Sequence, residues 1–233
     1  MAFNNYGNSI QRNTPVVLNL IIINVLVFAA QNMITQFDVT EWGSLHYYKS
    51  SLFKPHQLVT HMFMHMNVSH ILFNMFGLWM FGTILERFWG PKKFLIFYLI
   101  CGLGSAVFEQ LLVPYDSLHS AKNTAEYLAN PEMLPQIVES VKEYSYSLGA
   151  SGAIMGVFAA FAYLFPNTEL YVMFIPIPLK AKYVIPVFVL IDLFGGIYRI
   201  KGDNIGHFAH LGGAIVGFLL VLYWNKTNKK TFY

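Results

Sequence analysis

Two short polar motifs in otherwise apolar segments have the residue types needed for nucleophilic catalysis. In Gly149-Ala150-Ser151-Gly152, a serine hydroxyl stands at the start of an apolar segment, and His207 and His210 stand at the start of another. A serine is activated when a neighbouring base takes its proton, and imidazole is the usual base. We therefore expect Ser151 as the nucleophile and His210 as the base, with the two glycines supporting the site by leaving room around the serine.

Acyl transfer also needs hydrogen-bond donors for the negatively charged oxygen of the transition state. His70 and Asn74 are four residues apart, so they share one face of a helix, and with the backbone N–H of Ser151 they are the candidate donors. His61 and His65, which come just before them, are expected to tie the preceding loop to the top of that helix.

No third residue is clearly placed to orient the imidazole. Asp192 is a conceivable partner of His210, but structural hydrogen bonding in its own helix is the preferred interpretation. His207 suits structural hydrogen bonding and support of the site equally well. The remaining histidines, His46, His56 and His119, are expected to be interfacial or exposed, and Glu109 has no assigned role.

The composition of the 233-residue chain restricts the fold that carries these motifs. It is 55% hydrophobic and only 12% charged, whereas a soluble domain has about 25% charged residues. This excludes an ordinary soluble domain, a disordered protein and a coiled coil. The net charge of +3 is too small and scattered to indicate a nucleic-acid partner. A single cysteine, Cys101, excludes an internal disulfide and a thiolate zinc site.

Six apolar segments separated by polar ones predict an all-α, polytopic bundle of six transmembrane helices over residues 15–224. Residues 35–66 are expected as an aromatic interfacial loop, and 114–147, with seven charges, as a polar loop. Residues 1–14 and 225–233 are expected as short tails. The predicted helices cover residues 15–34, 68–88, 92–113, 148–165, 183–198 and 205–224.

The lysines and arginines predict the orientation of these helices. Nine lie on one side of the bundle and six on the other, so the positive-inside rule puts both termini in the cytoplasm and loop 114–147 outside. The two sets are Arg12, Arg87, Lys92, Lys93, Lys180, Lys182, Lys226, Lys229 and Lys230, against Lys49, Lys54, Lys122, Lys142, Arg199 and Lys201.

Small residues recur along the two helices that would carry Ser151 and His210. Such stripes allow two helix backbones to approach closely in a membrane. If the two stripes pack together, Ser151 and His210 meet a turn or two below the outer surface. The stripes are Gly152, Gly156 and Ala160 in one helix, and Gly206, His210, Gly213 and Gly217 in the other.

Three motifs resemble those of the rhomboid family of intramembrane serine proteases, in its bacterial-type six-helix form. They fall on the second, fourth and sixth predicted helices, as in that family, and the resemblance covers about residues 15–224. A further pattern that resembles the family follows the second helix. The motifs are His65…His70-x-x-x-Asn74, Gly149-x-Ser151-Gly152 and Ala209-His210-Leu-Gly-Gly213, and the further pattern is Gly82-x-x-x-Glu86-x-x-x-Gly90.

The resemblance implies a Ser151–His210 dyad that needs no cofactor or metal. The implied partners are the lipid bilayer and membrane-spanning substrates, which would be cut near the outer membrane boundary. The implied location is the bacterial inner (plasma) membrane. The chain departs from the pattern in loop 114–147, which is longer than a minimal member needs. It also has Met155 where some members have an aromatic residue against which the histidine stacks.

Three other functions are considered. The spacings of His61, His65 and His70, and of His207 and His210, superficially resemble the histidine boxes of a membrane metalloenzyme, but no two histidines are adjacent and HExxH is absent. A catalytically inactive rhomboid-like protein that binds membrane clients is the main alternative, against which the presence of both Ser151 and His210 argues. A transporter would be supported by two halves of matching hydropathy, which we do not find.

Overall fold

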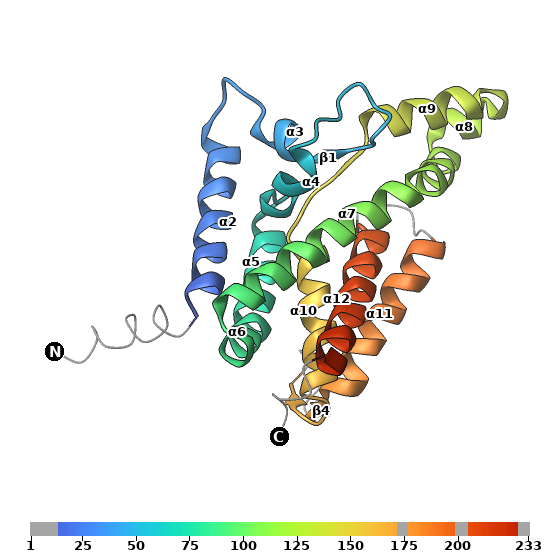
Figure 1. Cartoon of the computed structure of the whole chain (residues 1–233). Coiled ribbons are helices and arrows are strands. Elements are labelled where there is room, and N and C mark those ends of the chain that lie inside the picture. The colour runs from blue at the N-terminus through green and yellow to red at the C-terminus, as the bar shows by residue number, and fades with distance from the viewer. Residues whose placement is uncertain (1–13, 172–176, 199–204, 228–233) are drawn as a thin grey trace.

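The computed structural model describes residues 14–171, 177–198 and 205–227. Within these ranges, five helical segments are long and apolar enough to cross a membrane. They are α2 (Pro15–Met33), the continuous α5–η2–α6 (Val68–Gly77, Leu78–Gly82 and Thr83–Trp89), α7 (Pro91–Lys122), α11 (Ala181–Tyr198) and α12 (His207–Thr227). With the shorter apolar helix α10 (Ser151–Leu164) they form a bundle (Figure 1). The chain is thus an all-α, polytopic membrane protein, as the hydropathy pattern predicts.

The remaining elements are short and join or cover the long helices. Residues 1–13 and 228–233, which make up most of the predicted tails, lie outside the described residues. The short elements are α3 (Val39–Gly43), β1 (Leu45–His46), α4 (Gln57–Thr60), η1 (His61–Phe63), α8 (Ala125–Ala129), η3 (Pro131–Met133), α9 (Leu134–Tyr144), β2 (Tyr146–Ser147), β3 (Glu169–Leu170) and β4 (Leu179–Lys180).

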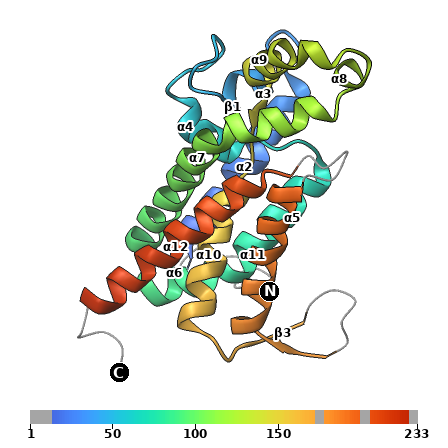
Figure 2. The same cartoon turned by 90° about the vertical axis from the view of Figure 1, so that its right-hand side faces the viewer.

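Helix α10 lies inside the bundle, in contact with α7, α11 and α12 (Figure 2). Its 14 residues extend about 21 Å, less than the roughly 30 Å of a bilayer core. An extended segment leads from α9 down to its first residue (Figure 1). Ser151, which begins α10, therefore lies within the bundle and not at its end.

Glycines bring α10 and α12 into backbone contact, as their spacing predicts. A Cβ atom on Gly213 would overlap the carbonyl of Gly152, and one on Gly217 would come within 2.5 Å of the Cα of Gly156. No side chain fits between the two helices at these levels. The prediction that the two small-residue stripes pack together is confirmed.

Helix α7 is longer than predicted. The sequence predicts that this helix ends at Val113, but it continues through Pro114 to Lys122. A proline inside a helix removes a hydrogen bond, yet the residues beyond it pack against α9, and Ser117, Ala121 and Ile137 are buried. This packing stabilises a continuation that the polar sequence does not indicate. The predicted loop 114–147 is therefore mostly helical.

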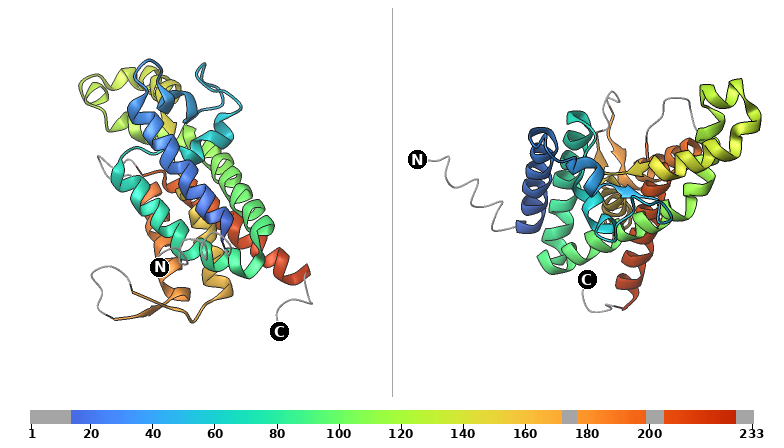
Figure 3. Two further views of the ribbon diagram at one scale, coloured as in Figure 1. Left: turned by 90° about the vertical axis from the view of Figure 1, so that its left-hand side faces the viewer. Right: turned by 90° about the horizontal axis from the view of Figure 1, so that it is seen from above.

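The end of the bundle that the predicted orientation places outside is covered by residues 38–66 and 115–147, which we call the outer cap. Strands β1 and β2 join its two parts, with Leu45 opposite Ser147 and His46 opposite Tyr146. His46 is only 1% exposed, so its predicted interfacial or exposed position is wrong, because this strand pairing covers it. Seen from above, α2 and the α8–α9 region lie on opposite sides of the bundle (Figure 3).

The opposite end of the bundle is fixed by a buried carboxylate. Both oxygens of Glu86 accept hydrogen bonds from the first turn of α2, at 2.9 Å from the N–H of Val16 and 2.8 Å from that of Val17. The first N–H groups of a helix have no partner within the helix, and a negative charge there is favourable. Glu86 therefore docks α2 onto α6.

Candidate active site

The structure brings Ser151 and His210 into hydrogen-bond contact. Ser151 is the first residue of α10 and His210 lies in the first turn of α12, and the close approach of these two helices leaves 2.7 Å between Ser151 Oγ and His210 Nε2. This distance is suitable for transfer of the hydroxyl proton to the imidazole. The contact joins residues 59 positions apart in the chain.

A third residue completes this arrangement, which differs from the sequence-based expectation. Asp192 Oδ1 lies 3.0 Å from His210 Nδ1 and 2.8 Å from His207 Nδ1. The carboxylate accepts, so Nδ1 of His210 carries the proton and Nε2 is free to accept the Ser151 hydroxyl hydrogen. The sequence favours structural hydrogen bonding of Asp192 within its own helix, whereas in the structure its side chain bridges α11 to α12.

A glycine allows His207 to reach Asp192. A Cβ atom on Gly195, one turn after Asp192 in α11, would overlap the His207 imidazole ring. His207 is 3% exposed and lies between the two helices. His207 and His210 thus share one oxygen of the Asp192 carboxylate. This hydrogen bonding is compatible with both roles expected for His207, structural hydrogen bonding and support of the site.

The candidate oxyanion donors face the same cavity as Ser151. The N–H of Met66 donates to His70 Nδ1 at 3.3 Å, so the proton of a neutral His70 is on Nε2. The Nδ2 atom of Asn74 is buried and has no hydrogen-bond partner among the described residues. Ser151 begins α10, so its N–H has no acceptor one turn earlier in the helix.

Gly149 is required next to these donors by its backbone and by its surroundings. Its φ of +130° is one that residues with a side chain rarely adopt, and an added Cβ would lie 2.9 Å from the His70 ring. Its N–H donates to the carbonyl oxygen of His61 at 2.9 Å. Gly152 likewise leaves room for Ser105, whose Oγ an added Cβ would overlap.

The site opens into a cavity of about 1030 Å³. Its floor includes Ser151, His210, His70 and Asn74, and its wall continues into the outer cap. The wall residues were not predicted as a group, although those on α7 recur at helical spacing and give this helix a polar face. They include Ser105, Glu109, Asp116, Ser117 and Ser120 of α7, and Tyr144 and Tyr146 near the end of α9.

Two further histidines lie next to the site, outside the spanning helices. His61 Nδ1 donates to the carbonyl of Gln57 at 2.8 Å, and His65 packs edge-on to His70 with ring centres 5.1 Å apart. Burial lowers the pKa of His61 to about 4, and burial followed by the nearby charge of His70 lowers the pKa of His65 to about 4. The N–H of His65 also donates to Gln31 of α2, so this segment is tied to the first helix.

Two more features concern the departure at Met155 and the histidine clusters noted in the sequence. Met155 packs with Ala159 and Ala214 in a small cluster of buried residues. Among the residues that the structure describes, no three His, Cys, Asp or Glu side chains are grouped so that they could hold a metal ion.

Comparison with known proteins connects this geometry to a family. Residues 53–226 match the Rhomboid domain. The mitochondrial RHOMBOID-like protein 12 of Arabidopsis thaliana is 34% identical over 223 residues, which are 93% of this chain and 60% of the relative. The human presenilin-associated rhomboid-like protein, also mitochondrial, is 28% identical over 226 residues, 94% of this chain and 51% of the relative.

A bacterial relative is similar over a shorter region. Rhomboid protease GluP of Bacillus subtilis is 28% identical over 163 residues, which are 70% of this chain and 24% of the relative. The chain thus spans between a quarter and three fifths of the length of these relatives. The matched region contains the helices that carry Ser151 and His210, and the chain belongs to the rhomboid family.

Proposed function

We propose that this protein is an intramembrane serine endopeptidase, which cleaves transmembrane segments of membrane proteins near the outer membrane boundary. The observation that carries the proposal is the 2.7 Å contact of Ser151 Oγ with His210 Nε2, in the lining of a cavity that also includes the buried Asn74 Nδ2, which has no partner among the described residues. Membership of a family that includes a relative named as a protease supports it.

In the proposed first half of the reaction, His210 Nε2 takes the hydroxyl proton as Ser151 Oγ attacks the scissile carbonyl carbon. The resulting oxyanion accepts hydrogen bonds from Asn74 Nδ2, His70 Nε2 and the N–H of Ser151. His210 then gives its proton to the leaving amine, and an acyl-enzyme remains.

In the second half, His210 takes a proton from water, whose oxygen attacks the ester carbon. The carboxylic acid product leaves and Ser151 regains its proton. Asp192, hydrogen bonded to Nδ1 at 3.0 Å, keeps the imidazole in the required tautomer and stabilises its positive charge in both halves. This role for Asp192 extends the Ser–His dyad that the family resemblance implies.

The depth of Ser151 within the bundle favours a membrane-spanning substrate. A helical substrate holds each carbonyl in a hydrogen bond, so it must unwind locally before attack. Glycine or proline near the cleaved bond lowers this cost by roughly 1–3 kcal/mol relative to a good helix former. A small residue before the bond suits a site bordered by Gly149 and Gly152. We expect cleavage to fall when such residues in a reporter are replaced by leucine.

The location of this multi-pass protein is also a proposal. The predicted bacterial inner (plasma) membrane and a mitochondrial membrane, which the names of two relatives suggest, are both compatible with the spans. The count of basic residues supports both termini on one side and the outer cap on the other. In a Cys101→Ser background, cysteines at Asn123 and Thr227 should react with an impermeant thiol reagent from opposite sides. Reaction of both from one side would contradict this orientation.

The direct test of the proposed activity is cleavage of a single-span reporter by the purified chain in lipid vesicles. Ser151→Ala should abolish cleavage without lowering the melting temperature, because it removes only a hydroxyl group. Ser120→Ala, which alters another serine of the same cavity, should leave cleavage within about twofold of the unaltered chain. Equal cleavage by the Ser151→Ala protein would refute the mechanism. Folded, unaltered protein that never cleaves or reacts would favour an inactive client-binding relative.

A further inference from the structure

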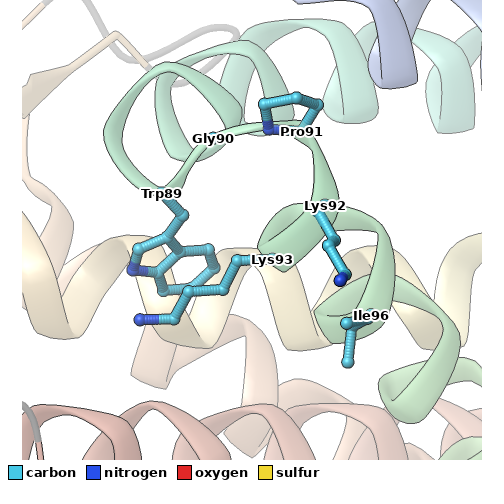
Figure 4. Close-up of a pocket in the computed structure, with 6 residues that line it drawn as sticks. All are labelled: Trp89, Gly90, Pro91, Lys92, Lys93 and Ile96. Carbon is cyan, nitrogen blue, oxygen red and sulfur yellow. The ribbon is translucent and has the colours of Figure 1, made fainter.

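A second hollow lies at the other end of the bundle, where α6 turns into α7. This open groove has a volume of about 310 Å³ and is lined by Trp89, Gly90, Pro91, Lys92, Lys93 and Ile96 (Figure 4). Its lining thus combines the apolar surfaces of an indole, a proline and an isoleucine with two lysines. The proposed proteolytic mechanism uses none of these residues.

The lysine next to the tryptophans is held in place by aromatic contacts. The Nζ atom of Lys93 lies 4.6 Å from the ring centre of Trp224, in the last turns of α12, and 5.8 Å from that of Trp89. The two indoles pack edge to face, with their centres 5.5 Å apart. Figure 4 shows Lys93 running alongside the Trp89 ring and Lys92 extending toward Ile96. The groove therefore has two ammonium groups beside an apolar surface.

No carboxylate of the described residues pairs with either lysine. The acidic residue nearest in sequence, Glu86, is 1% exposed and accepts hydrogen bonds from the first turn of α2. Elsewhere at this end of the bundle, Lys180 has Glu169 opposite it across the β3–β4 pair. The described residues thus supply no negative charge to the groove, and an anion bound there would lie close to two ammonium groups.

We propose that this groove binds an anionic membrane phospholipid, with its phosphate between Lys92 and Lys93. The choice of a lipid over a free phosphate rests on the apolar part of the groove. Trp89 and Trp224 lie at the ends of membrane-spanning helices, where tryptophan marks the membrane interface. Ile96 is 42% exposed and continues from the groove along the outside of α7, where the first part of an acyl chain can lie. Basic pockets between membrane helices bind anionic headgroups in this way.

The test is lipid binding by the purified full-length chain in mixed micelles, measured by native mass spectrometry. Phosphatidylglycerol, phosphatidylcholine with the same acyl chains, and inorganic phosphate are titrated separately. Each interfacial lysine strengthens binding to anionic lipid by roughly fivefold, so Lys92→Gln with Lys93→Gln should weaken phosphatidylglycerol binding by roughly 25-fold. Lys92→Gln alone leaves the Lys93–tryptophan packing intact and should weaken it by roughly fivefold.

A charge-matched control separates this groove from general attraction to a basic surface. Lys180→Gln with Lys182→Gln removes the same charge from two exposed lysines outside the groove, and it should weaken binding by less than about threefold. Lys93→Gln should weaken phosphatidylglycerol binding. Lys93→Arg keeps both the charge and the aromatic contact, so this variant should bind phosphatidylglycerol as the unaltered chain does. Equal losses from the two lysine pairs would overturn the proposal. So would equal affinity for the two lipids, or occupancy by inorganic phosphate that excludes phosphatidylglycerol.

Discussion

The α10–α12 contact and the outer cap are held together by different means. Between α10 and α12, Gly213 lies directly on the backbone of Gly152. In and around the outer cap, side chains span the gaps. Gln110 of α7 donates to the carbonyl of His46 in the cap, and within the cap Ser51 donates to the carboxylate of Glu143. A backbone contact cannot absorb even one added carbon atom, whereas each hydrogen bond contributes only about 1 kcal/mol net. The distance between Ser151 and His210 therefore depends on the backbone contact between α10 and α12, whereas the outer cap can tolerate substitutions.

The largest effect should come from Gly213→Val, which forces α12 away from α10. Because a displacement of about 1 Å can cost roughly 100-fold in rate, we expect at least that loss of reporter cleavage, with a lower melting temperature in detergent. Gly206→Ala is the control, since among the described residues its added Cβ would meet only Ala209, at an ordinary 3.6 Å. If Gly213→Val cleaves normally, the backbone contact does not set the catalytic distance.

Asp192→Asn should have the next largest effect, because Asp192 is hydrogen bonded to the imidazole of His210. The amide can donate to His210 Nδ1 and so favour the wrong tautomer, and we expect kcat to fall roughly 100-fold or more. Because the side chain keeps its size, the melting temperature should change little. Steady-state kinetics with the reporter measure this effect. A loss confined to KM, or a loss of folding without a change in kcat, would assign Asp192 a structural role only.

The buried histidines of the outer cap should make the stability of the chain sensitive to acid. His61 and His65 have folded pKa values of about 4, below the ordinary value near 6.5. Unfolding therefore takes up protons, so the stability is fully present above pH 6.5 and is lost as the pH falls toward 4. The loss is at most about 3 kcal/mol for each histidine. Melting temperatures across this range measure it, and His65→Leu should reduce the slope. An unchanged slope in that variant would remove His65 from this explanation.

The smallest effect should come from Glu143→Gln in the outer cap. Its side chain is only partly exposed to solvent and accepts from the backbone N–H and hydroxyl of Ser51, and an amide oxygen can still accept one of these bonds. We expect a loss of about 1 kcal/mol or less in stability, and cleavage within about twofold. A loss of cleavage as large as that of Gly213→Val would show that the cap, too, sets the catalytic geometry.

These two regions also differ in how far the sequence predicts them. The stripes containing Gly152 and Gly213 are visible because helical periodicity is a local property, and they lead directly to the contact between Ser151 and His210. Asp192 gives no such signal, because its partners lie on another helix and depend on how α11 packs. The spacing of residues along one helix does not indicate how that helix packs against another.

The outer cap shows the same limit more strongly. The end of α7 beyond Pro114 is helical only because α9 packs against it, and His46 is buried only because β1 pairs with β2. Polar composition correctly indicates that residues 114–147 differ from the membrane helices. It does not indicate that they form helices themselves, since their stability comes from contacts with distant residues.

The most direct test of whether His210 activates Ser151 is labelling of the folded chain by a serine-directed fluorophosphonate. The modified residue is located by peptide mass spectrometry. A serine next to a base reacts, whereas the many unactivated serines do not. The proposed mechanism predicts a single adduct, on Ser151, and its loss in a folded His210→Ala chain. An adduct on a different serine, or equal labelling of Ser151 after His210→Ala, would contradict it.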